Sequence, residues 1–518
     1  MSRAPGLSLT GLSLTRATLT GATLTGAALM ALCPAARAAR PDELRGSYSF
    51  DAADELDFVD GPAGVVRVHF SRSGPNQTLL DDADLSGAPD FAEAVAASAE
   101  AVLELYAGIG LRPPVPEAEL GLDTLGGSGA FDFYLVDFAG VADGLFSVDD
   151  CAGDVCVGHM RIENDFEGYG YRDLDEAVST LTSHELFHAV QAAYARTLPV
   201  WLSEGTAVWA QRRFDPDSRD FLGFCDAYLT DPGRSLDRPP AGAVTSFSYG
   251  TALYFEHLSD RHGVGVVDAL LAEMAGRPEE EGALAIDAAL GAFADSLGAS
   301  WAAFAPRALA TGRRSGALTG AFDFAHQIGP VPLEAEADGL LEDDHRFYPL
   351  ASSAFRVDHA GGPIALAVAD AADGVVFTLH PVQGGEADGP VEDAVVTWTP
   401  SEPGLSVLAD ELPAGGYLLL GAYAEQADES RKIAFCFGPP DAAAACLGPG
   451  DSGGPAADSG APAADTGAEG GGGDADGEAD GGAKDGCACA SGGTRSPAGA
   501  ALIALLGLGA LRRRRTDA

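Results

Sequence analysis

The feature that most constrains the fold of this 518-residue chain is a pair of histidines four positions apart. His184 and His188 enclose Glu185 in H-E-L-F-H, within the stretch DLDEAVSTLTSHELFHAVQAAYA. Apolar residues recur in this stretch at helical spacing, and Asp173 or Asp175 can cap its start. On a helix, residues i and i+4 share one face, so both imidazoles must point into the same volume. The sequence therefore predicts one helix with a paired-imidazole face.

A second helix is predicted after Pro199, a residue that suits the first turn of a helix. Glu204 then lies about a turn and a half inside that helix, on an element rigid enough to face the first. Two neutral imidazoles and one carboxylate form a ligand set that suits Zn²⁺ and leaves the fourth position to water. We therefore expect His184, His188 and Glu204 to bind zinc. Glu185 lies one residue along the first helix, where a general base for that water is needed.

These motifs resemble the gluzincin branch of the zincins, in particular its peptidase-MA-like group. The resemblance rests on H-E-x-x-H followed by P-x-W-L-x-E-G-x-A, with a spacing from His188 to Glu204 slightly shorter than in thermolysin. Further segments are similar to a subgroup of secreted metalloproteases from myxobacteria and their relatives. They are RVHFSRSG, DDADLSGAPDF, FDFYLVDF, HAVQAAY, YGTALYFEHL and AIDAALGAFADSLGASWAAFA, which together extend from about Val66 to Ala310.

The resemblance implies a thermolysin-like α+β domain in which His184, His188 and Glu204 hold zinc and Glu185 is the catalytic base. The implied reaction is hydrolysis of a peptide bond in a protein or peptide substrate. One position departs from the pattern, because Val208 stands where thermolysin has an acidic residue four positions after the ligand glutamate. Support for a zinc-bound histidine must therefore come from another residue.

A second electrophile beside the metal is expected, because negative charge develops on the carbonyl oxygen of the substrate. Tyr249 is the candidate, since SFSYGTALYFEHL starts a helix where related zincins often carry a tyrosine. A core aromatic on an amphipathic helix explains Tyr249 equally well. Tyr254, His257 and His262 are weaker candidates for the same role.

A second group of metal-ligating side chains occurs in LDDADLSGAPDF. Asp82, Asp84 and Asp90 surround Gly87 at spacings that resemble part of a calcium-binding loop. The bidentate glutamate at the twelfth position of such loops is missing. A solvated acidic turn is the better interpretation, with calcium as the alternative.

Formal charge and the N-terminus restrict partners and location. A net charge of -46 argues against nucleic acid, whose phosphates would be repelled. Residues 1–38 resemble a signal peptide, with Arg3 and Arg16, the apolar ATLTGAALMALCPAARAA and a small-residue cleavage site near Ala38. Leu32 is too large for the small-residue position before a lipoprotein cysteine, so Cys33 is not expected to be lipidated. The protein is therefore expected to be exported.

The C-terminal region is expected to attach the protein to the outer surface of the cell. Residues 439–486 contain almost no large apolar side chains and are predicted to form a disordered Gly/Ala/Asp/Pro stalk. Residues 487–518 contain GCACASGG, a short apolar stretch and four arginines, and they resemble the MYXO-CTERM sorting tail. That resemblance implies trimming near Cys487 by a membrane-bound sorting peptidase. An ordinary membrane anchor is the alternative, disfavoured because the apolar stretch is short for a span.

Export makes the cysteines informative, because disulfides persist in oxidising compartments. Cys151 and Cys156 can close a small loop, and Cys436 and Cys446 can link the end of a second domain. Cys225 is left over and is expected to be a buried thiol.

Two folded domains are predicted. Residues 39–320 alternate short strands, such as GVVRVHF and FDFYLVDF, with Ala-rich helices and suit the α+β zincin domain. Residues 340–438 change to period two, with the segments FRVDHA, IALAVAD, VVFTLH, AVVTWT, LSVLAD, YLLLGAY and KIAFCFG, which predict an all-β sandwich. The sequence favours a zinc endopeptidase. The alternatives are a surface adhesin or binding protein with an inactive zincin fold, and an aminopeptidase, although no G-x-M-E-N exopeptidase motif is present.

Overall fold

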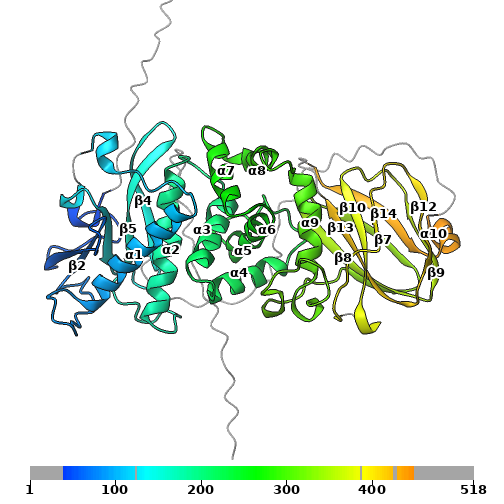
Figure 1. The fold of residues 1–518 in the computed structure, drawn as a ribbon, viewed down its shortest axis with the longest axis horizontal. Helices are drawn as coiled ribbons and strands as arrows, with labels where there is room; N and C mark the ends of the chain where they lie inside the picture. The colour runs from blue at the N-terminus through cyan, green and yellow to red at the C-terminus, as the bar shows by residue number, and fades with distance from the viewer. Residues whose placement is uncertain (1–38, 123–124, 386–387, 424–428, 448–518) are drawn as a thin grey trace, which may run out of the picture. The chain divides into compact units, whose positions relative to one another are not determined.

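The computed structural model describes residues 39–122, 125–385, 388–423 and 429–447 (Figure 1). Helices and several β-sheets are mixed in these residues, as the sequence predicts. The signal peptide predicted at 1–38, residues 448–486 of the predicted stalk and the sorting tail at 487–518 lie outside the described residues. Among the described residues, no helix is long and apolar enough to cross a membrane.

A five-stranded sheet forms the first layer, with strand order β1-β2-β3-β5-β4. The strands are β1 (Leu56–Asp60), β2 (Val66–Ser71), β3 (Phe131–Val136), β4 (Gly144–Ala152) and β5 (Val155–Glu163). Strands β2, β3 and β5 are parallel, whereas β1 and β4 are antiparallel to their neighbours. Within the described residues β4 pairs with β5 alone, so it is an edge strand of this sheet.

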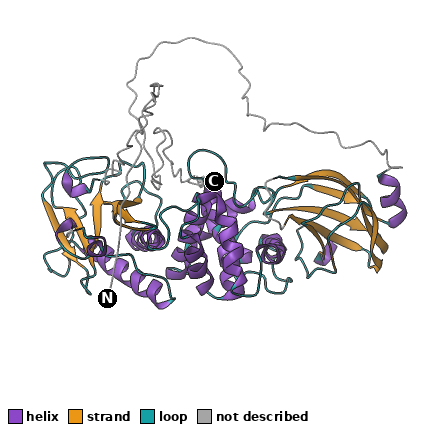
Figure 2. Ribbon diagram, turned by 90° about the horizontal axis from the view of Figure 1, so that it is seen from above, coloured by secondary structure: helices purple, strands orange, loops and turns teal. Residues whose placement is uncertain are grey.

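Helices α1 (Asp90–Gly108) and α2 (Leu174–Ala192) lie against one face of this sheet (Figure 2). The period-two pattern of β2 buries Val66, Val68 and Phe70 completely. Ala99 and Val102 of α1 belong to the same core and are also fully buried. Helix α2 therefore has one side against the sheet and its other side toward the helices that follow in the chain.

Further helices complete the first part of the chain. They are α3 (Val200–Phe214), α4 (Arg219–Leu229), α5 (Ser246–Gly250), α6 (Ala252–His262), α7 (Gly265–Met274), α8 (Gly282–Gly291) and α9 (Leu297–Leu309). Short 3-10 turns lie at Pro41–Glu43, Glu117–Leu120, Leu125–Gly127, Glu279–Glu281, Gly312–Arg314 and Ala325–Gln327, and one more, Gln383–Gly385, lies among the later strands. Helix α3 packs against α2, α5 and α6, which places it at the centre of the helical layer (Figure 1).

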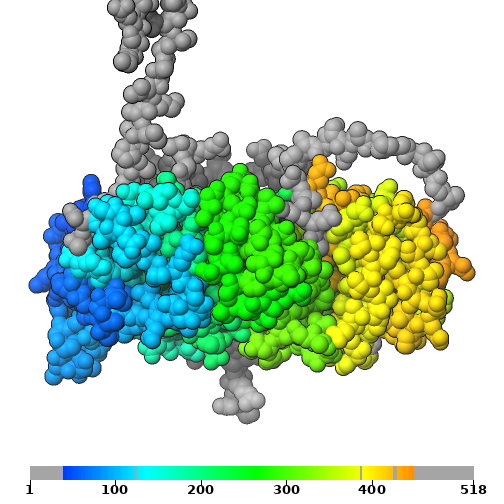
Figure 3. Space-filling model, turned by 45° about the horizontal axis from the view of Figure 1, so that its top comes forward, coloured from blue at the N-terminus to red at the C-terminus, as the bar shows by residue number. Residues whose placement is uncertain are grey.

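Residues from Ala335 onward form two further sheets. One has the strand order β11-β10-β13-β8-β6 and the other β12-β9-β14-β7. The strands are β6 (Ala335–Asp338), β7 (Leu341–Phe347), β8 (Ala351–His359), β9 (Gly362–Val368), β10 (Val375–Pro381), β11 (Val396–Trp398), β12 (Gly404–Leu412), β13 (Gly415–Tyr423) and β14 (Arg431–Gly438). Phe355 and Phe377 of the first sheet meet Phe435 of the second at ring-centroid distances of 5.3 and 5.7 Å. The two sheets thus pack face to face around one apolar core, in the part of the chain that is coloured from yellow-green to orange in Figure 3.

All seven strands predicted in this region are present, as β8 to β14, but the boundaries differ from the prediction at both ends. Strands β6 and β7 were missed because charged side chains alternate with few apolar ones in AEAD and LEDDHRF. At the other end, helix α10 (Pro440–Cys446) occupies the first residues of the predicted stalk. A disulfide from Cys446 to Cys436 and the burial of Ala443 hold this helix against the sheet.

Both predicted disulfides are present. Cys151 and Cys156 join β4 to β5 across an antiparallel pair, and Cys436 is linked to Cys446. Cys225 is the free, buried thiol that the sequence predicts.

Candidate metal and catalytic site

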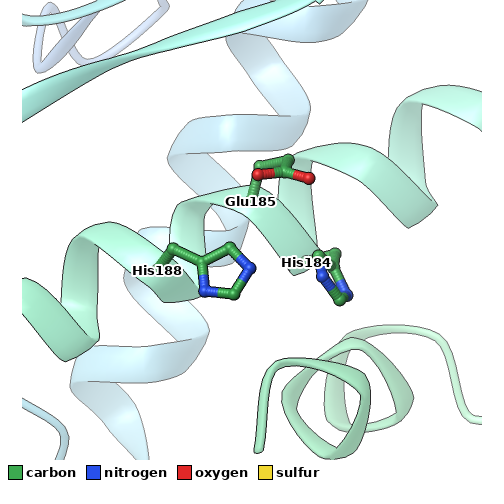
Figure 4. A group of neighbouring side chains, drawn as sticks. All are labelled: His184, Glu185 and His188. Atoms are coloured by element: carbon green, nitrogen blue, oxygen red, sulfur yellow. The ribbon is translucent and has the colours of Figure 1, made fainter. Parts of the chain in front are cut away.

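Helices α2 and α3 bring the three predicted metal ligands together. His184 Nε2 lies 3.3 Å from Glu204 Oε2, and His188 Nε2 lies 3.6 Å from the same oxygen. The two imidazole rings, which come from successive turns of α2, have centroids 5.0 Å apart (Figure 4). Two nitrogen donors and one carboxylate therefore face a single volume.

The position of α3 follows from local chemistry at its start. Gly205, next to Glu204, touches α6 so closely that a Cβ there would overlap the side chain of Thr251. The hydroxyl of Thr251 donates a hydrogen bond of 2.6 Å to the carbonyl of Trp201. At the start of α2, Asp173 caps the helix by accepting a hydrogen bond of 2.9 Å from the backbone N–H of Glu176. These contacts fix both helices and hence the approach of Glu204 to the histidines.

The donor set fits a zinc ion. Imidazole nitrogen and carboxylate oxygen are ordinary zinc ligands, and a site with three protein ligands leaves one position for water or substrate. His184, His188 and Glu204 are each at least nine-tenths buried, so only a small part of each side chain is exposed to solvent. Burying these polar groups so close together costs free energy unless they share a proton or a cation.

In the metal-free protein a proton takes that place. Burial alone would lower the pKa of the His188 imidazole, but the charge and hydrogen bond of Glu204 outweigh it and raise the pKa to about 9. Burial favours the neutral form of Glu204, yet His188 and His184 hold the pKa of its carboxyl well below the ordinary value. The protonated His188 and the ionised Glu204 thus form a buried ion pair. A metal ion must displace this proton in order to bind.

Glu185 is held on the sheet side of the same helix. The backbone N–H of Phe146 on β4 donates a hydrogen bond of 3.1 Å to Glu185 Oε2. Gly144 lies so close that a Cβ there would be 2.8 Å from Glu185 Cγ. A carboxylate oxygen of Glu185 lies within 4.8 Å of an imidazole nitrogen of both His184 and His188. Burial raises the pKa of the Glu185 carboxyl, and the neighbouring imidazoles oppose this rise.

The proposed ligands and Glu185 line a cleft with a volume of about 470 Å³. Its walls are the start of β4, helix α4 and the short helix α5, which contributes Tyr249. The ring of Tyr249 lies 5.8 Å from that of His184 and stacks on Phe224 at a centroid distance of 4.7 Å. Tyr249 is thus next to the predicted metal ligands, where the sequence placed its candidate electrophile.

One wall of the cleft carries carboxylates that the sequence analysis did not single out. Tyr171 donates a hydrogen bond of 2.6 Å from its hydroxyl to Asp143 Oδ2. Burial, and next the charge of Asp143, raise the pKa of Asp220 to about 6. Glu176 also lines the cleft but is paired with Arg219 at 3.1 Å. No motif marks Asp143 or Asp220. The one available signal was the stretch GLFSVDDCAGDVCVGHMRIE, where a Gly-Asp turn between two cysteines indicates a hairpin next to Asp143.

The weaker candidates lie outside the residues that line the cleft. The hydroxyl of Tyr254 is within hydrogen-bonding distance of Ser300, at 3.3 Å. His257 contacts Arg307, and His262 contacts Asp295. They are structural residues of the helical layer, and Tyr249 is the one of the four that faces the site.

The aspartates of the predicted calcium turn are close together. Asp82, Asp84 and Asp90 each offer an oxygen within 4.8 Å of the others. The two carboxylate oxygens of Asp82 accept hydrogen bonds of 3.0 Å from the backbone N–H groups of Ser86 and Gly87. Such bonds occur in an acidic turn that holds no metal, so calcium binding stays a prediction.

The zinc-loaded protein is expected to gain stability over the metal-free protein as the pH rises. The stability that His188 contributes through its raised pKa is fully present below 6.5 and is lost as the pH rises through about 9. Zinc needs the same imidazole in its neutral form, so zinc binding strengthens over that range. Calorimetric melting temperatures with and without zinc should therefore diverge across it.

Mg²⁺ in place of zinc is the control for this comparison, because it prefers oxygen ligands and should not raise the melting temperature in this way. If the rise in melting temperature caused by zinc is the same at every pH, the assignment of His188 as a ligand is contradicted.

No family model matches the chain, and no curated protein matches it. Among solved structures, the chain is similar to the pre-peptidase C-terminal domain of a collagenase from Bacillus anthracis, with 10% identity and a TM-score of 0.16, covering 21% of this chain and 98% of that chain. It is also similar to PliG of Aeromonas hydrophila, a periplasmic inhibitor of g-type lysozyme, with 11% identity and a TM-score of 0.15, covering 20% of this chain and 95% of that chain. A beta-glucosidase from Paenibacillus barengoltzii has 13% identity and a TM-score of 0.14, covering 23% of this chain and 12% of that chain. Similarities at these TM-scores assign neither a fold nor a function.

Proposed function

We propose that this protein is an exported zinc endopeptidase of the gluzincin type. The observation that carries the proposal is the approach of His184 Nε2 and His188 Nε2 to one oxygen of Glu204, at 3.3 and 3.6 Å, with Glu185 beside them. Zinc, when bound, supplies Lewis acidity, which makes water a stronger acid and polarises a carbonyl group. The two disulfides support export, because such bonds persist in oxidising compartments.

Glu185 acts as the general base in this proposal. Its carboxylate takes a proton from the water that attacks the peptide carbonyl carbon. When the C–N bond breaks, the same carboxyl group returns the proton to the departing amine nitrogen. The raised pKa of Glu185 suits this exchange, because a base works best when its pKa is near the operating pH. The hydrogen bond from Phe146 holds the group in place for both steps.

The substrate backbone is expected to lie along β4. This strand is an edge of its sheet in the described residues, and Gly144, Leu145 and Phe146 line the cleft. An extended peptide can pair with such an edge through main-chain hydrogen bonds, whatever its side chains. Binding of this kind requires no free terminus, which favours cleavage within a chain over removal of terminal residues.

Glu185→Gln is expected to abolish turnover while zinc remains bound. The amide cannot accept the proton of the attacking water, so hydrolysis should fall by about 10²- to 10⁴-fold. Casein and peptide-library digestion, with and without a chelator, measures the activity, and metal analysis measures the zinc.

Glu104→Gln, an exposed position on α1, is the control for Glu185→Gln and should behave as wild type. Zinc bound by a wild-type protein that cleaves nothing would favour the binding-protein alternative. Loss of zinc from Glu185→Gln would instead assign Glu185 to the ligand set.

Tyr249→Phe tests whether the hydroxyl of Tyr249 stabilises negative charge on the substrate. If it does, kcat should fall by about 10²-fold or more with little change in KM. Tyr348→Phe is the control and should leave the kinetics unchanged. Tyr348 is 43% exposed and lies between β7 and β8. An unchanged kcat for Tyr249→Phe would show that Tyr249 is only a packing residue beside His184.

Gly144→Ala is expected to impair hydrolysis without loss of zinc. The added Cβ would lie 2.8 Å from Glu185 Cγ, so the base must move, and a displacement of about 1 Å can cost about 10²-fold in rate. Gly223 lines the same cleft and a Cβ there meets nothing within 4 Å, so Gly223→Ala is the matched control. Equal rates for the two variants would mean that the contact between β4 and Glu185 does not position the base.

A further inference from the structure

We propose that Gln191 is the positioning residue that keeps the proton of His188 on Nδ1 and so leaves Nε2 free to bind zinc. The inference rests on the zinc site of the proposed function and adds a residue to it. Gln191 follows His188 by three positions on α2 and is 3% exposed. Its Oε1 lies 2.8 Å from His188 Nδ1.

The orientation of the Gln191 amide is fixed by its other contacts. Its Nε2 lies 2.8 Å from the carbonyl oxygen of Ser203 and 2.8 Å from Thr206 Oγ1, both on α3. The carbonyl can only accept a hydrogen bond. The Thr206 hydroxyl donates its own hydrogen to the carbonyl of Leu202 at 2.7 Å, so toward Gln191 it accepts. Both positions require the NH₂ group, and the amide oxygen is therefore the atom that faces His188.

An amide oxygen that faces His188 determines where the imidazole carries its proton. Because Oε1 can only accept, His188 Nδ1 must be the donor in the 2.8 Å contact. Ser203 Oγ donates to the same Oε1 at 3.0 Å, which strengthens its role as an acceptor. In the neutral ring the lone pair is then on Nε2. That is the atom 3.6 Å from Glu204 Oε2, on the side of the ligand set.

This arrangement supplies the support that Val208 cannot give. Val208 is fully buried in the apolar core and has no polar side-chain atom. The hydrogen-bond acceptor for His188 comes instead from Gln191, which lies on the same helix α2, about one turn beyond His188. The same amide joins α2 to α3 through Ser203 and Thr206, so it couples the orientation of His188 to the helix that carries Glu204.

The test is zinc affinity, measured on the full chain by competition with a chelator. Gln191→Met keeps the length of the side chain and removes the acceptor, and it should weaken zinc binding by about 10- to 100-fold. Gln191→Glu keeps an acceptor toward His188 Nδ1 but loses the donor to the carbonyl of Ser203, so it should recover only part of that loss. Gln211→Met is the matched control, because Gln211 is a buried glutamine on α3 that donates to Ser218 at 2.8 Å. Its zinc affinity should equal that of wild type.

Nuclear magnetic resonance of zinc-loaded protein with ¹⁵N-labelled histidine gives a second readout that a merely structural role would not move. The hydrogen of His188 should be found on Nδ1, with Nε2 as the metal-bound nitrogen. Thr206→Val, which leaves Gln191 in place but removes the hydroxyl that fixes its amide, should weaken zinc binding by a smaller factor than Gln191→Met. It also keeps the inference testable if Gln191→Met does not fold.

Two results would overturn the inference: a hydrogen on Nε2 of His188, or equal zinc affinity in wild type, Gln191→Met and Thr206→Val. Failure of the proposed function has a different signature. In that case the wild-type protein itself would bind no zinc or would bind zinc and cleave no substrate, whereas failure of this inference alone leaves wild-type zinc binding and hydrolysis intact.

Discussion

The contact on which the site depends is the packing of α3 against α2, because it brings Glu204 to two histidines of another helix. Helix periodicity alone aligns His184 with His188, but it cannot bring in a carboxylate from a different element. The close approach of Gly205 to α6 and the amide of Gln191 hold α3 where Glu204 Oε2 meets both imidazoles. A shift of α3 would separate the donor atoms and remove the common volume that a metal needs.

The sheet contributes the other half of the chemistry. Its edge strand β4 holds the side chain of Glu185 through the N–H of Phe146, so a contact with the sheet fixes the proposed base although the base shares α2 with both histidines. The acidic side chains of Asp143 and Asp220 line the same cleft. When ionised, these two carboxylates contribute negative electrostatic potential inside the cleft, where it acts directly on a bound substrate.

Local sequence patterns were enough to predict the two helices of the site and both disulfides. A helix start capped by Asp173 or Asp175, the interruption at Pro199 and both cysteine pairs were predicted because each depends on neighbours in the chain, and the structure selects Asp173 as the cap. Which strand forms the sheet edge beside the site could not be predicted, because strand order in a sheet depends on contacts between distant segments. The same holds for Gln191, whose importance lies in where its amide points. The charged alternation of β7 concealed a strand that is recognisable only once its partner β14 is in place.

The central claim, that His184, His188 and Glu204 bind one zinc ion, is tested most directly by X-ray absorption spectroscopy at the zinc edge on the purified protein. The account predicts a first shell of two imidazole nitrogens and at least one carboxylate oxygen at about 2.0 to 2.2 Å, together with water. A spectrum of hydrated zinc with no imidazole scattering, or one unaltered in the Glu204→Ala variant, would contradict it.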